Sequence, residues 1–433
     1  MVEIKPFRGI TYNKEKINNL DEVMSPPYDI ISDEMQDTLY KTHENNFVRL
    51  ILNKIKNDDN SKDNRYIRAL KLYTKWLDED ILIQSDKEAI FPYKISYKIN
   101  NQEVTMNGFF TLLKLDFDYK YVKAHERTLS KPKADRLNLM RKTKSNLEPI
   151  QLLYIDEKDK IRKRIDKNIN SPIIDVKGYD GFNHKLWKIE DKELINLVKD
   201  FLDDRILFIA DGHHRYQTAL NYAKEIEKKT GINDNNADFH YRMVILANIF
   251  DEGLSILPTH RLIKMNNINL DKILNKLSKY FTIKKVDFDS NNQDISKKIM
   301  NDIKTDNEHI FAMYTGQNYY IFKLLDEKSM DEFGKEHSQT WRTLDVSILH
   351  KIILEYGFGI NQDNLEDHVK YTREDDEAIK FVDNNKFNLS FLMNATKIEE
   401  LRKIAEAGEH MPQKSTYFLP KMLSGLVMYK IEF

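Results

Sequence analysis

The sequence predicts a mixed α/β (α+β) protein, and three observations indicate this class. Its 433 residues are enough for two or three domains of ordinary size. An apolar strand-like run at 206–209 leads into a segment with helical character, and residues 62–80 have helical periodicity. Residues 89–116 alternate in polarity like two paired strands with Asn100 and Asn101 at the turn, which is typical of a hairpin.

The first elements follow from local signals. EIKPFRGITYN reads as a strand and a turn, and the doubled proline predicts a stiff extended loop at 26–29. Ser32 is the predicted N-cap of a helix that runs to about Lys41. NFVRLIL, at 46–52, has the β-branched and aromatic composition of a strand. The apolar stripe within 62–80 predicts a core-packed helix.

The later elements lead to a two-domain division. A strand is expected at QLLYID, a helix from near His214 to about Lys229, and a strongly apolar strand at 241–250. Beyond about Leu262 the pattern changes to a helix, a hairpin around Gly316 and a last strand near the C terminus. We therefore expect a phosphate-binding catalytic region at 1–264 and an α+β region at 265–433, whose final loop returns to the site.

The amino-acid composition excludes several kinds of partner and of catalytic chemistry. The formal net charge is -1, so we expect no nucleic-acid partner. The chain has 0 cysteines, which excludes disulfides, thiolate zinc sites, iron–sulfur ligation and a cysteine nucleophile. No apolar run approaches the roughly 20 residues that span a bilayer, so we expect no membrane partner and a cytoplasmic location. The sequence leaves open whether the chain forms a homo-oligomer.

Asp211-Gly212-His213-His214-Arg215 is the most informative segment. It lies between an apolar strand and a helix, and Gly212 can adopt conformations closed to other residues. Such a turn brings main-chain N–H groups and the positive end of the helix towards an anion. The plain alternative is a helix capped by Asp211 with two surface histidines. The five residues together favour phosphate chemistry.

The basic segment 123–149 allows two readings. A solvated basic helix and an anion-binding wall are about equally good explanations of its charges. Its start, His125-Glu126-Arg127-Thr128, favours a functional role. Glu126, a carboxylate among cations, is the best candidate for a base that activates a hydroxyl, although a salt-bridged structural role explains it equally well.

Six short motifs stand out along the chain. They are Ser25-Pro26-Pro27-Tyr28-Asp29, His125-Glu126-Arg127-Thr128, Lys133-Ala134-Asp135-Arg136, Asp211-Gly212-His213-His214-Arg215-Tyr216, Pro258-Thr259-His260-Arg261 and Met411-Pro412-Gln413-Lys414-Ser415-Thr416. Together and in this order they resemble the family catalogued as domain of unknown function 1015. The turn at 211–215 also looks, more distantly, like the Gly-x-His-Arg phosphate-binding turn of the ParB/sulfiredoxin superfamily, which includes CTP-hydrolysing ParB, ATP-using sulfiredoxin and free-serine kinases. Sulfiredoxin activity is excluded because the chain lacks cysteine.

These features together predict a phosphotransferase, because phosphoryl transfer needs positioned donors and cationic charge more than covalent chemistry. The expected catalytic residues are His125, Glu126, His213, His214 and Arg215. The expected phosphate-binding residues are Asp211, Gly212, His213, His214, Arg215, Arg127, Lys133 and Arg136. The expected substrate-binding residues are Tyr28, Asp29, Thr128, His260, Arg261, Lys414, Ser415 and Thr416.

The superfamily resemblance implies free L-serine as the acceptor among small hydroxylated metabolites, and O-phosphoserine as the product. The donor is expected to be pyrophosphate, ATP or ADP, with Mg2+ at Asp211 as the cofactor. Two alternatives stay open. A metal-dependent phosphohydrolase would use Asp211, His213, His214 and His260 as ligands. A non-catalytic regulator of ParB type would bind nucleotide without turnover.

Overall fold

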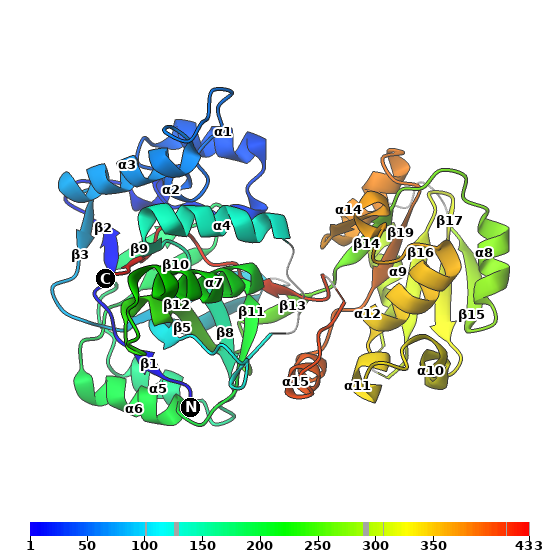
Figure 1. Ribbon diagram of the computed structural model, residues 1–433. Coiled ribbons are helices and arrows are strands. Elements are labelled where there is room, and N and C mark those ends of the chain that lie inside the picture. The colour runs from blue at the N-terminus through cyan, green and yellow to red at the C-terminus, as the bar shows by residue number, and fades with distance from the viewer. Residues whose placement is uncertain (100–101, 125–129, 289–293, 306, 413, 433) are drawn as a thin grey trace. The chain divides into compact units, whose positions relative to one another are not determined.

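The computed structural model describes residues 1–99, 102–124, 130–288, 294–305, 307–412 and 414–432 (Figure 1). These residues form two compact units. Unit 1 contains the described residues within 1–124, 128–255 and 420–433, and unit 2 contains those within 256–419. Unit 2 is therefore inserted between two parts of unit 1.

Unit 1 is built on a mixed sheet. Its strands β8 and β12 are parallel, and β11 is antiparallel to β8, so the end of β11 lies at the same edge as the start of β8. Among the described residues, the sheet has the order β6 (Val122–Lys123), β11 (Leu207–Asp211), β8 (Ile150–Tyr154), β12 (Tyr241–Asn248), β5 (Gln102–Lys114), β4 (Phe91–Ile99), β10 (Asn183–Leu186), β9 (Ile174–Lys177), with β1 (Ile4–Lys5) paired to β5.

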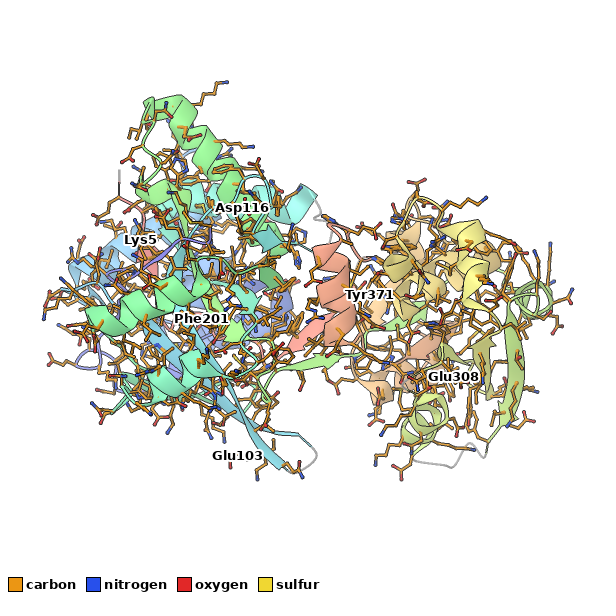
Figure 2. All side chains as sticks on the ribbon, turned by 90° about the horizontal axis from the view of Figure 1, so that it is seen from below. Lys5, Glu103, Asp116, Phe201, Glu308 and Tyr371 are labelled. Atoms are coloured by element: carbon orange, nitrogen blue, oxygen red, sulfur yellow. The ribbon has the colours of Figure 1, made fainter. Side chains whose placement is uncertain are left out.

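The strands of this sheet follow the apolar pattern of the sequence. All eight residues of β12 are buried, which explains why 241–250 reads as a continuous apolar run. The β4–β5 hairpin is confirmed, with Phe91 paired to Phe110 and Ile99 to Gln102. Its predicted turn at Asn100-Asn101 lies outside the described residues. Figure 2 shows Glu103 at the outer end of this hairpin.

Helices cover the sheet of unit 1. The longest, α7 (His213–Thr230), packs beside α4 (Ser130–Thr143), and α4 packs beside α3 (Arg65–Asp78), as Figure 1 shows. The predicted α7 is confirmed, and Gly231 ends it in the left-handed conformation at φ +69°. The others are α1 (Asp33–Thr42), α2 (Val48–Ile51), α5 (Lys160–Asp166) and α6 (Lys192–Leu202).

Unit 2 has an antiparallel sheet with helices α9 and α14 packed on its strands. Its core includes Ile299, Tyr319, Ile379 and Leu392. The predicted hairpin around Gly316 is confirmed, with Gly316 at φ +88°. The sheet order is β15 (Phe281–Asp287), β17 (Asn318–Leu324), β16 (Ile310–Tyr314), β19 (Leu389–Met393), β14 (His260–Ile263), β18 (Val369–Thr372). The helices are α8 (Leu270–Leu277), α9 (Ile295–Ile303), α10 (Met330–Phe333), α11 (Gln339–Arg342), α12 (Asp345–Ile348), a π-helix (Leu349–Phe358), α13 (Leu365–His368), α14 (Asp375–Asp383) and α15 (Ile398–Glu406).

Three local expectations differ from the structure. The strand expected at 46–52 is wrong, because α2 forms there and the Asn46 side chain accepts a hydrogen bond from the N–H of Val48 at 3.0 Å. The loop after Pro27 is not fully extended, since Tyr28–Ile30 forms a 3-10 turn. The division near residue 264 falls after β14, whereas the compact units change at 255–256, because β14 pairs with β18 and β19 in unit 2.

The segment 420–432 returns to unit 1 and pairs with its N-terminal part. Met428 bridges to Ile10, Ser424 bridges to Ser25, and β21 (Tyr429–Lys430) pairs with β7 (Ser145–Asn146). Met428 has no exposed surface. Because Met428 is fully buried, the segment is part of the unit 1 core.

We predict that Met428→Ala lowers the free energy of unfolding by about 2–5 kcal/mol, because it leaves a cavity where a fully buried side chain packed. Lys430→Ala, in the same segment but exposed, should change it by less than about 0.5 kcal/mol. Urea denaturation of both variants measures the difference. Equal effects would contradict the core role of this segment.

Candidate phosphate-binding site

The strand-to-helix turn at Gly212 is the centre of the candidate site. The pairing of β11 with β8 shifts register between Ile209 and Asp211, and Gly212 then adopts φ +94°. The first α7 hydrogen bond runs from the N–H of Tyr216 to the carbonyl of Gly212 at 2.9 Å. The first four N–H groups of a helix have no partner within it, so the turn presents main-chain donors at the positive end of α7.

Two buried cations hold the carboxylate of Asp211. Lys421 donates to Oδ1 and Arg215 donates to Oδ2, and Arg215 also donates to the carbonyl of Pro149. Arg215 and Lys421 are only 6% and 7% exposed. Burial alone would raise the pKa of Asp211, but the charges of Lys421 and Arg215 outweigh it and lower that pKa well below its usual range. The carboxylate is therefore ionised at neutral pH.

A second set of charges lies on α4. Arg136, which is 6% exposed, pairs with Asp135 and places its guanidinium carbon 3.9 Å from the centroid of the Tyr28 ring. Asp135 also accepts from Arg65 and, at 2.7 Å, from the hydroxyl of Tyr66. Burial would raise the pKa of Asp135, yet Arg136 and the other donors lower it. This part of α4 is packed against the unit, so it is not a freely solvated basic helix.

Glu148 links these elements. Its Oε1 accepts from the N–H of Tyr28 at 3.1 Å and from the hydroxyl of Ser424 at 3.0 Å. Its Oε2 lies 3.4 Å from Nη1 of Arg136. The carbonyl of Glu148 accepts from Nη2 of Arg242 at 2.8 Å. The segment with the doubled proline, α4 and the C-terminal segment therefore meet at one buried carboxylate.

Sequence reasoning missed Lys421, Glu148, Arg242 and Gln151. Gln151 lies opposite Asp211 in the β8–β11 pairing and is 2% exposed, and within the described part of the chain its side-chain amide has no hydrogen-bond partner. None of the four stands in a motif beside the turn, and Lys421 is separated from Asp211 by the whole of unit 2. Only the Lys-rich character of the C-terminal ending gave a signal.

The structure places the predicted site residues in different parts of the molecule. Those near the turn in unit 1 are Tyr28, Asp29, Lys133, Arg136, Asp211, Gly212, His213, His214 and Arg215, whereas His260, Arg261, Lys414, Ser415 and Thr416 belong to unit 2. His125, Glu126, Arg127 and Thr128 lie outside the described residues.

Within unit 1, the predicted residues contact one another to different degrees. The charge of exposed Asp29 raises the pKa of Arg215, although Asp211 contributes more. His213 is 7% exposed at the start of α7, and its charge is one of those that lower the pKa of Asp211. Lys133 contributes its carbonyl, which accepts from the hydroxyl of Thr218 at 3.4 Å. Packing thus brings α4 and α7 together beside the turn.

The predicted residues of unit 2 have internal contacts. Nε2 of His260 lies 2.7 Å from Asp375, and its Nδ1 accepts from the N–H of Met393 at 3.3 Å. Arg261 has no exposed surface and donates to the carbonyls of Thr259 and Lys414. The hydroxyl of Ser415 donates to the carbonyl of Pro412. A substrate-binding role for these side chains stays a prediction.

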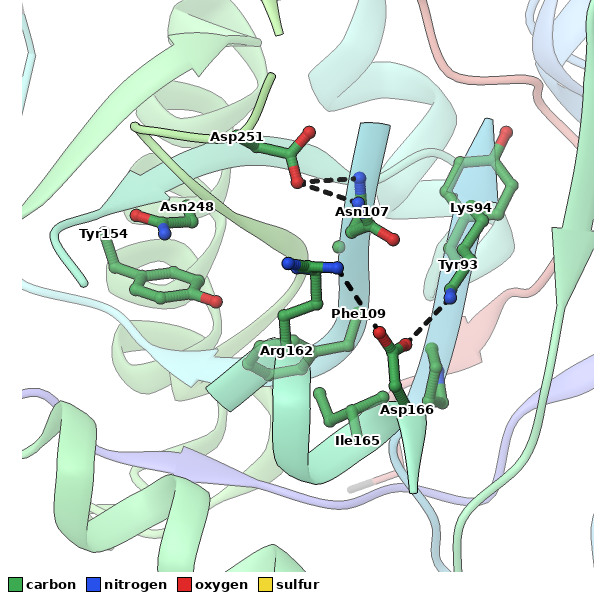
Figure 3. A pocket seen from close by; sticks show the side chains of 12 residues that line it. Tyr93, Lys94, Asn107, Phe109, Tyr154, Arg162, Ile165, Asp166, Asn248 and Asp251 are labelled. Atoms are coloured by element: carbon green, nitrogen blue, oxygen red, sulfur yellow. Dashed lines mark hydrogen bonds and ion pairs between the residues drawn. The ribbon is translucent and has the colours of Figure 1, made fainter. Parts of the chain in front are cut away.

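A separate hollow lies at the carboxyl ends of β8 and β12, opposite the edge where β11 ends. Figure 3 shows Asp166 between Lys94, at 2.8 Å, and Arg162, at 3.5 Å. It also shows Asp251 bonded to Asn107, whose Nδ2 lies 2.9 Å away. Burial raises the pKa of Asp251. The charged groups here already have partners, so this hollow lacks the excess of cations found beside the turn.

The described residues show neither a metal cluster nor a membrane-spanning helix. They contain no group of three His, Asp or Glu side chains arranged to hold a metal ion. Every described helix is too short or too polar to cross a bilayer.

The fold is mixed α/β, as predicted, and the chain belongs to a family without an assigned activity. The family described as "Protein of unknown function (DUF1015)" matches residues 4–347. This confirms the family resemblance. Five of the six motifs lie within the matched residues, and the motif at 411–416 lies outside them. None of the curated proteins matches the chain.

Several solved structures are similar. A free serine kinase variant in complex with AMP is 12% identical, with a TM-score of 0.36, over 72% of this chain and 87% of that chain. A conserved hypothetical protein from Pyrococcus furiosus is 13% identical, with a TM-score of 0.34, over 72% and 90%. C-terminally truncated SbnI from Staphylococcus aureus is 11% identical, with a TM-score of 0.34, over 73% and 85%.

We predict that Gly212→Ala weakens phosphate binding, because an added Cβ would lie 3.0 Å from Nε of Arg215 at a φ of +94°. Gly231, at the other end of α7, is the matched control: its φ is +69° and a Cβ would meet nothing within 4 Å. Both variants should lose about 1–2 kcal/mol of stability from the left-handed backbone. Only Gly212→Ala should weaken phosphate binding, as measured by titration calorimetry.

We also predict that Asp211→Asn lowers the free energy of unfolding at pH 7 by about 3–5 kcal/mol, because it removes the charged carboxylate to which the buried Lys421 and Arg215 both donate. The folded pKa of Asp211 lies below its unfolded value. Its contribution is therefore present above about pH 4 and is lost as the pH falls towards the folded pKa. Denaturation at several pH values should show the difference between wild type and Asp211→Asn shrinking in acid. The exposed Asp200→Asn is the control, and a constant difference would contradict the assignment.

Proposed function

We propose that unit 1 is a phosphotransferase that binds a phosphate group at the Gly212 turn and transfers a phosphoryl group to a small hydroxylated metabolite, with free L-serine as the leading acceptor. One observation carries the proposal. The N terminus of α7 begins at a left-handed glycine and is flanked by two buried cations that share one carboxylate.

The charge at this turn suits a phosphate. Arg215 and Lys421 together carry two positive charges against the single negative charge of Asp211. Since both cations are held by Asp211, they keep their positions before a ligand arrives, which lowers the reorganisation needed to bind an anion. The N-terminal N–H groups of α7 add donors at the same place. An incoming phosphate can accept hydrogen bonds from these N–H groups while the two cations attract its negative charge.

In the proposed reaction the acceptor hydroxyl oxygen attacks the terminal phosphorus of the donor. The new P–O bond forms while the bond to the leaving phosphate or nucleotide breaks, and the leaving group keeps the electron pair. Arg215 and Lys421 offset the charge that spreads over the transferred oxygens. The hydroxyl proton must pass to a base.

Asp211 is a poor candidate for that base. Its pKa is lowered far below neutrality by Lys421 and Arg215, so the proton affinity of its carboxylate is small. Glu126 therefore stays the predicted base, and it lies outside the described residues.

The donor set was tested for Mg2+ at Asp211, and it does not fit. Lys421 occupies Oδ1 and Arg215 occupies Oδ2, so an ion there would have to displace one of them. Mg2+ prefers several carboxylate, phosphate or water oxygens in octahedral geometry. The two cations thus supply the positive charge that a metal would supply. A requirement for Mg2+ carried by the donor phosphates stays a prediction.

The first experiment offers the full chain pyrophosphate, ATP or ADP together with L-serine, each with and without Mg2+, and measures O-phosphoserine by mass spectrometry. Formation with any donor supports the proposal. Its absence with every donor, in both directions of the reaction, would refute it. Phosphate release without an acceptor would instead support a hydrolase, and nucleotide binding without turnover a regulator.

Lys421→Met should lower kcat/KM by about 10²-fold or more, because one of two cations that stabilise the transferred charge is lost. Lys228→Met, which changes an exposed lysine near the other end of α7, should leave kcat/KM unchanged. Steady-state kinetics of both variants give the comparison. An unchanged rate in Lys421→Met would remove this lysine from the reaction.

A further inference from the structure

A small cavity lies between α4, α7 and the first residues of β12, and we call it the arginine pocket. Its polar lining residues are all less than 7% exposed. They are Arg136, Arg215, Arg242, Glu148, Ser145 and Thr218. Leu139, Met140 and Leu147 complete the described lining. Three arginines and one glutamate thus line the same small cavity.

Arg242 is the unusual member of this pocket. It is 4% exposed, and its Nη2 donates to the carbonyl of Glu148 at 2.8 Å. Its Nε and Nη1 are buried and have no hydrogen-bond acceptor among the residues that the structure describes. A buried guanidinium with unused donors is costly unless an acceptor is supplied. The pocket therefore has donors prepared for a group that the described chain does not provide.

The carboxylates beside the pocket are already engaged. Arg136 pairs with Asp135, and Arg215 pairs with Asp211. Oε1 of Glu148 accepts hydrogen bonds from the N–H of Tyr28 and the hydroxyl of Ser424, and its Oε2 accepts from the guanidinium of Arg136. Burial, and then the charge of Arg215, lower the pKa of Arg242 to about 9, which leaves it protonated at neutral pH. The positive charge of Arg242 thus lacks a carboxylate of its own.

The size of the cavity limits what can enter. Its volume is about 30 Å3. A cavity needs roughly 10–15 Å3 to hold one water molecule, so this one holds a single compact group and excludes a whole nucleotide. A tetrahedral oxyanion presents several acceptors and negative charge within such a volume, and guanidinium groups bind it through paired N–H bonds.

We propose that the arginine pocket is an oxyanion site in which Arg242, together with Arg136 and Arg215, binds one phosphate ion or the phosphate group of a small ester. This goes beyond the proposed function, because binding here requires no transfer. Arg215 borders both the pocket and the Gly212 turn, so a phosphate in the pocket is coupled to the turn through one side chain.

Arg242→Met tests the pocket. Methionine has a similar length and no charge, so the variant should melt at the same or a higher temperature than wild type in phosphate-free buffer, since it removes an uncompensated buried charge. Wild type should be stabilised by potassium phosphate relative to potassium chloride of equal ionic strength. In Arg242→Met the dissociation constant for inorganic phosphate should rise at least tenfold. Arg205→Met, which changes a more exposed arginine of unit 1, is the control and should bind like wild type.

The outcomes separate this site from the turn. The assignment of the arginine pocket as an oxyanion site would be overturned if Arg242→Met bound phosphate as well as wild type does. It would also be overturned if phosphate stabilised wild type no more than chloride does. If Arg215→Ala loses phosphate binding while Arg242→Met keeps it, phosphate binds at the turn only, and the proposed function survives without the pocket. If Arg242→Met loses it and no donor yields phosphoserine, the pocket survives without the proposed function.

A crystal structure of the wild-type chain with arsenate supplies a measurement that does not depend on a variant. Anomalous density of arsenic is expected in the arginine pocket, with the arsenate oxygens within hydrogen-bond distance of Nε and Nη1 of Arg242. Density at the Gly212 turn with none in the arginine pocket would overturn the proposal. Crystals with acetate in place of arsenate show whether a carboxylate takes the same position, and acetate bound with no arsenate in the pocket would overturn the choice of a phosphate-like ion.

Discussion

The carboxylate of Asp211 is the interaction on which the candidate site depends. It joins the end of β11, the first turn of α7 and the segment after unit 2, because Arg215 and Lys421 donate to its two oxygens. A buried carboxylate is stable in this place only because both cations accompany it. In return, the two cations stay ordered and charged in an interior that would otherwise exclude them. The same three residues thus stabilise the structure and supply the charges of the proposed anion site.

Local signals predicted much of the fold. Gly212 and Gly231 mark the two ends of α7, and the alternating pattern of 89–116 marks a hairpin, because these features are encoded within a few neighbouring residues. The strand expected at 46–52 failed for the opposite reason. Its β-branched composition suits a strand, but a short buried helix begins there, where the Asn46 side chain accepts a hydrogen bond from the N–H of Val48, and packing overrides propensity in so short a segment.

The candidate site was predictable only where it is local in sequence. The charged groups of the turn at 211–215 are neighbours in the sequence, so their spacing alone identifies Asp211 and Arg215 as candidates. Lys421, Glu148 and Arg242 come from three other parts of the chain and stand in no pattern that singles them out. Their role arises from burial beside other charges, which a single sequence does not display. His260 and Arg261 stand in a conspicuous motif and have contacts inside unit 2, and their substrate-binding role stays a prediction.

The insertion of unit 2 between residues 255 and 420 has a consequence for biosynthesis. A ribosome makes Asp211, Gly212 and Arg215 long before it makes Lys421, so the nascent turn exists for the whole synthesis of unit 2 with one of its two cations missing. The strands β13 (Ser255–Leu257) and β20 (Tyr417–Leu419) pair with each other, which brings the returning chain back to its point of departure. The proposed anion site therefore gains its second cation only after the whole of unit 2 has been synthesised.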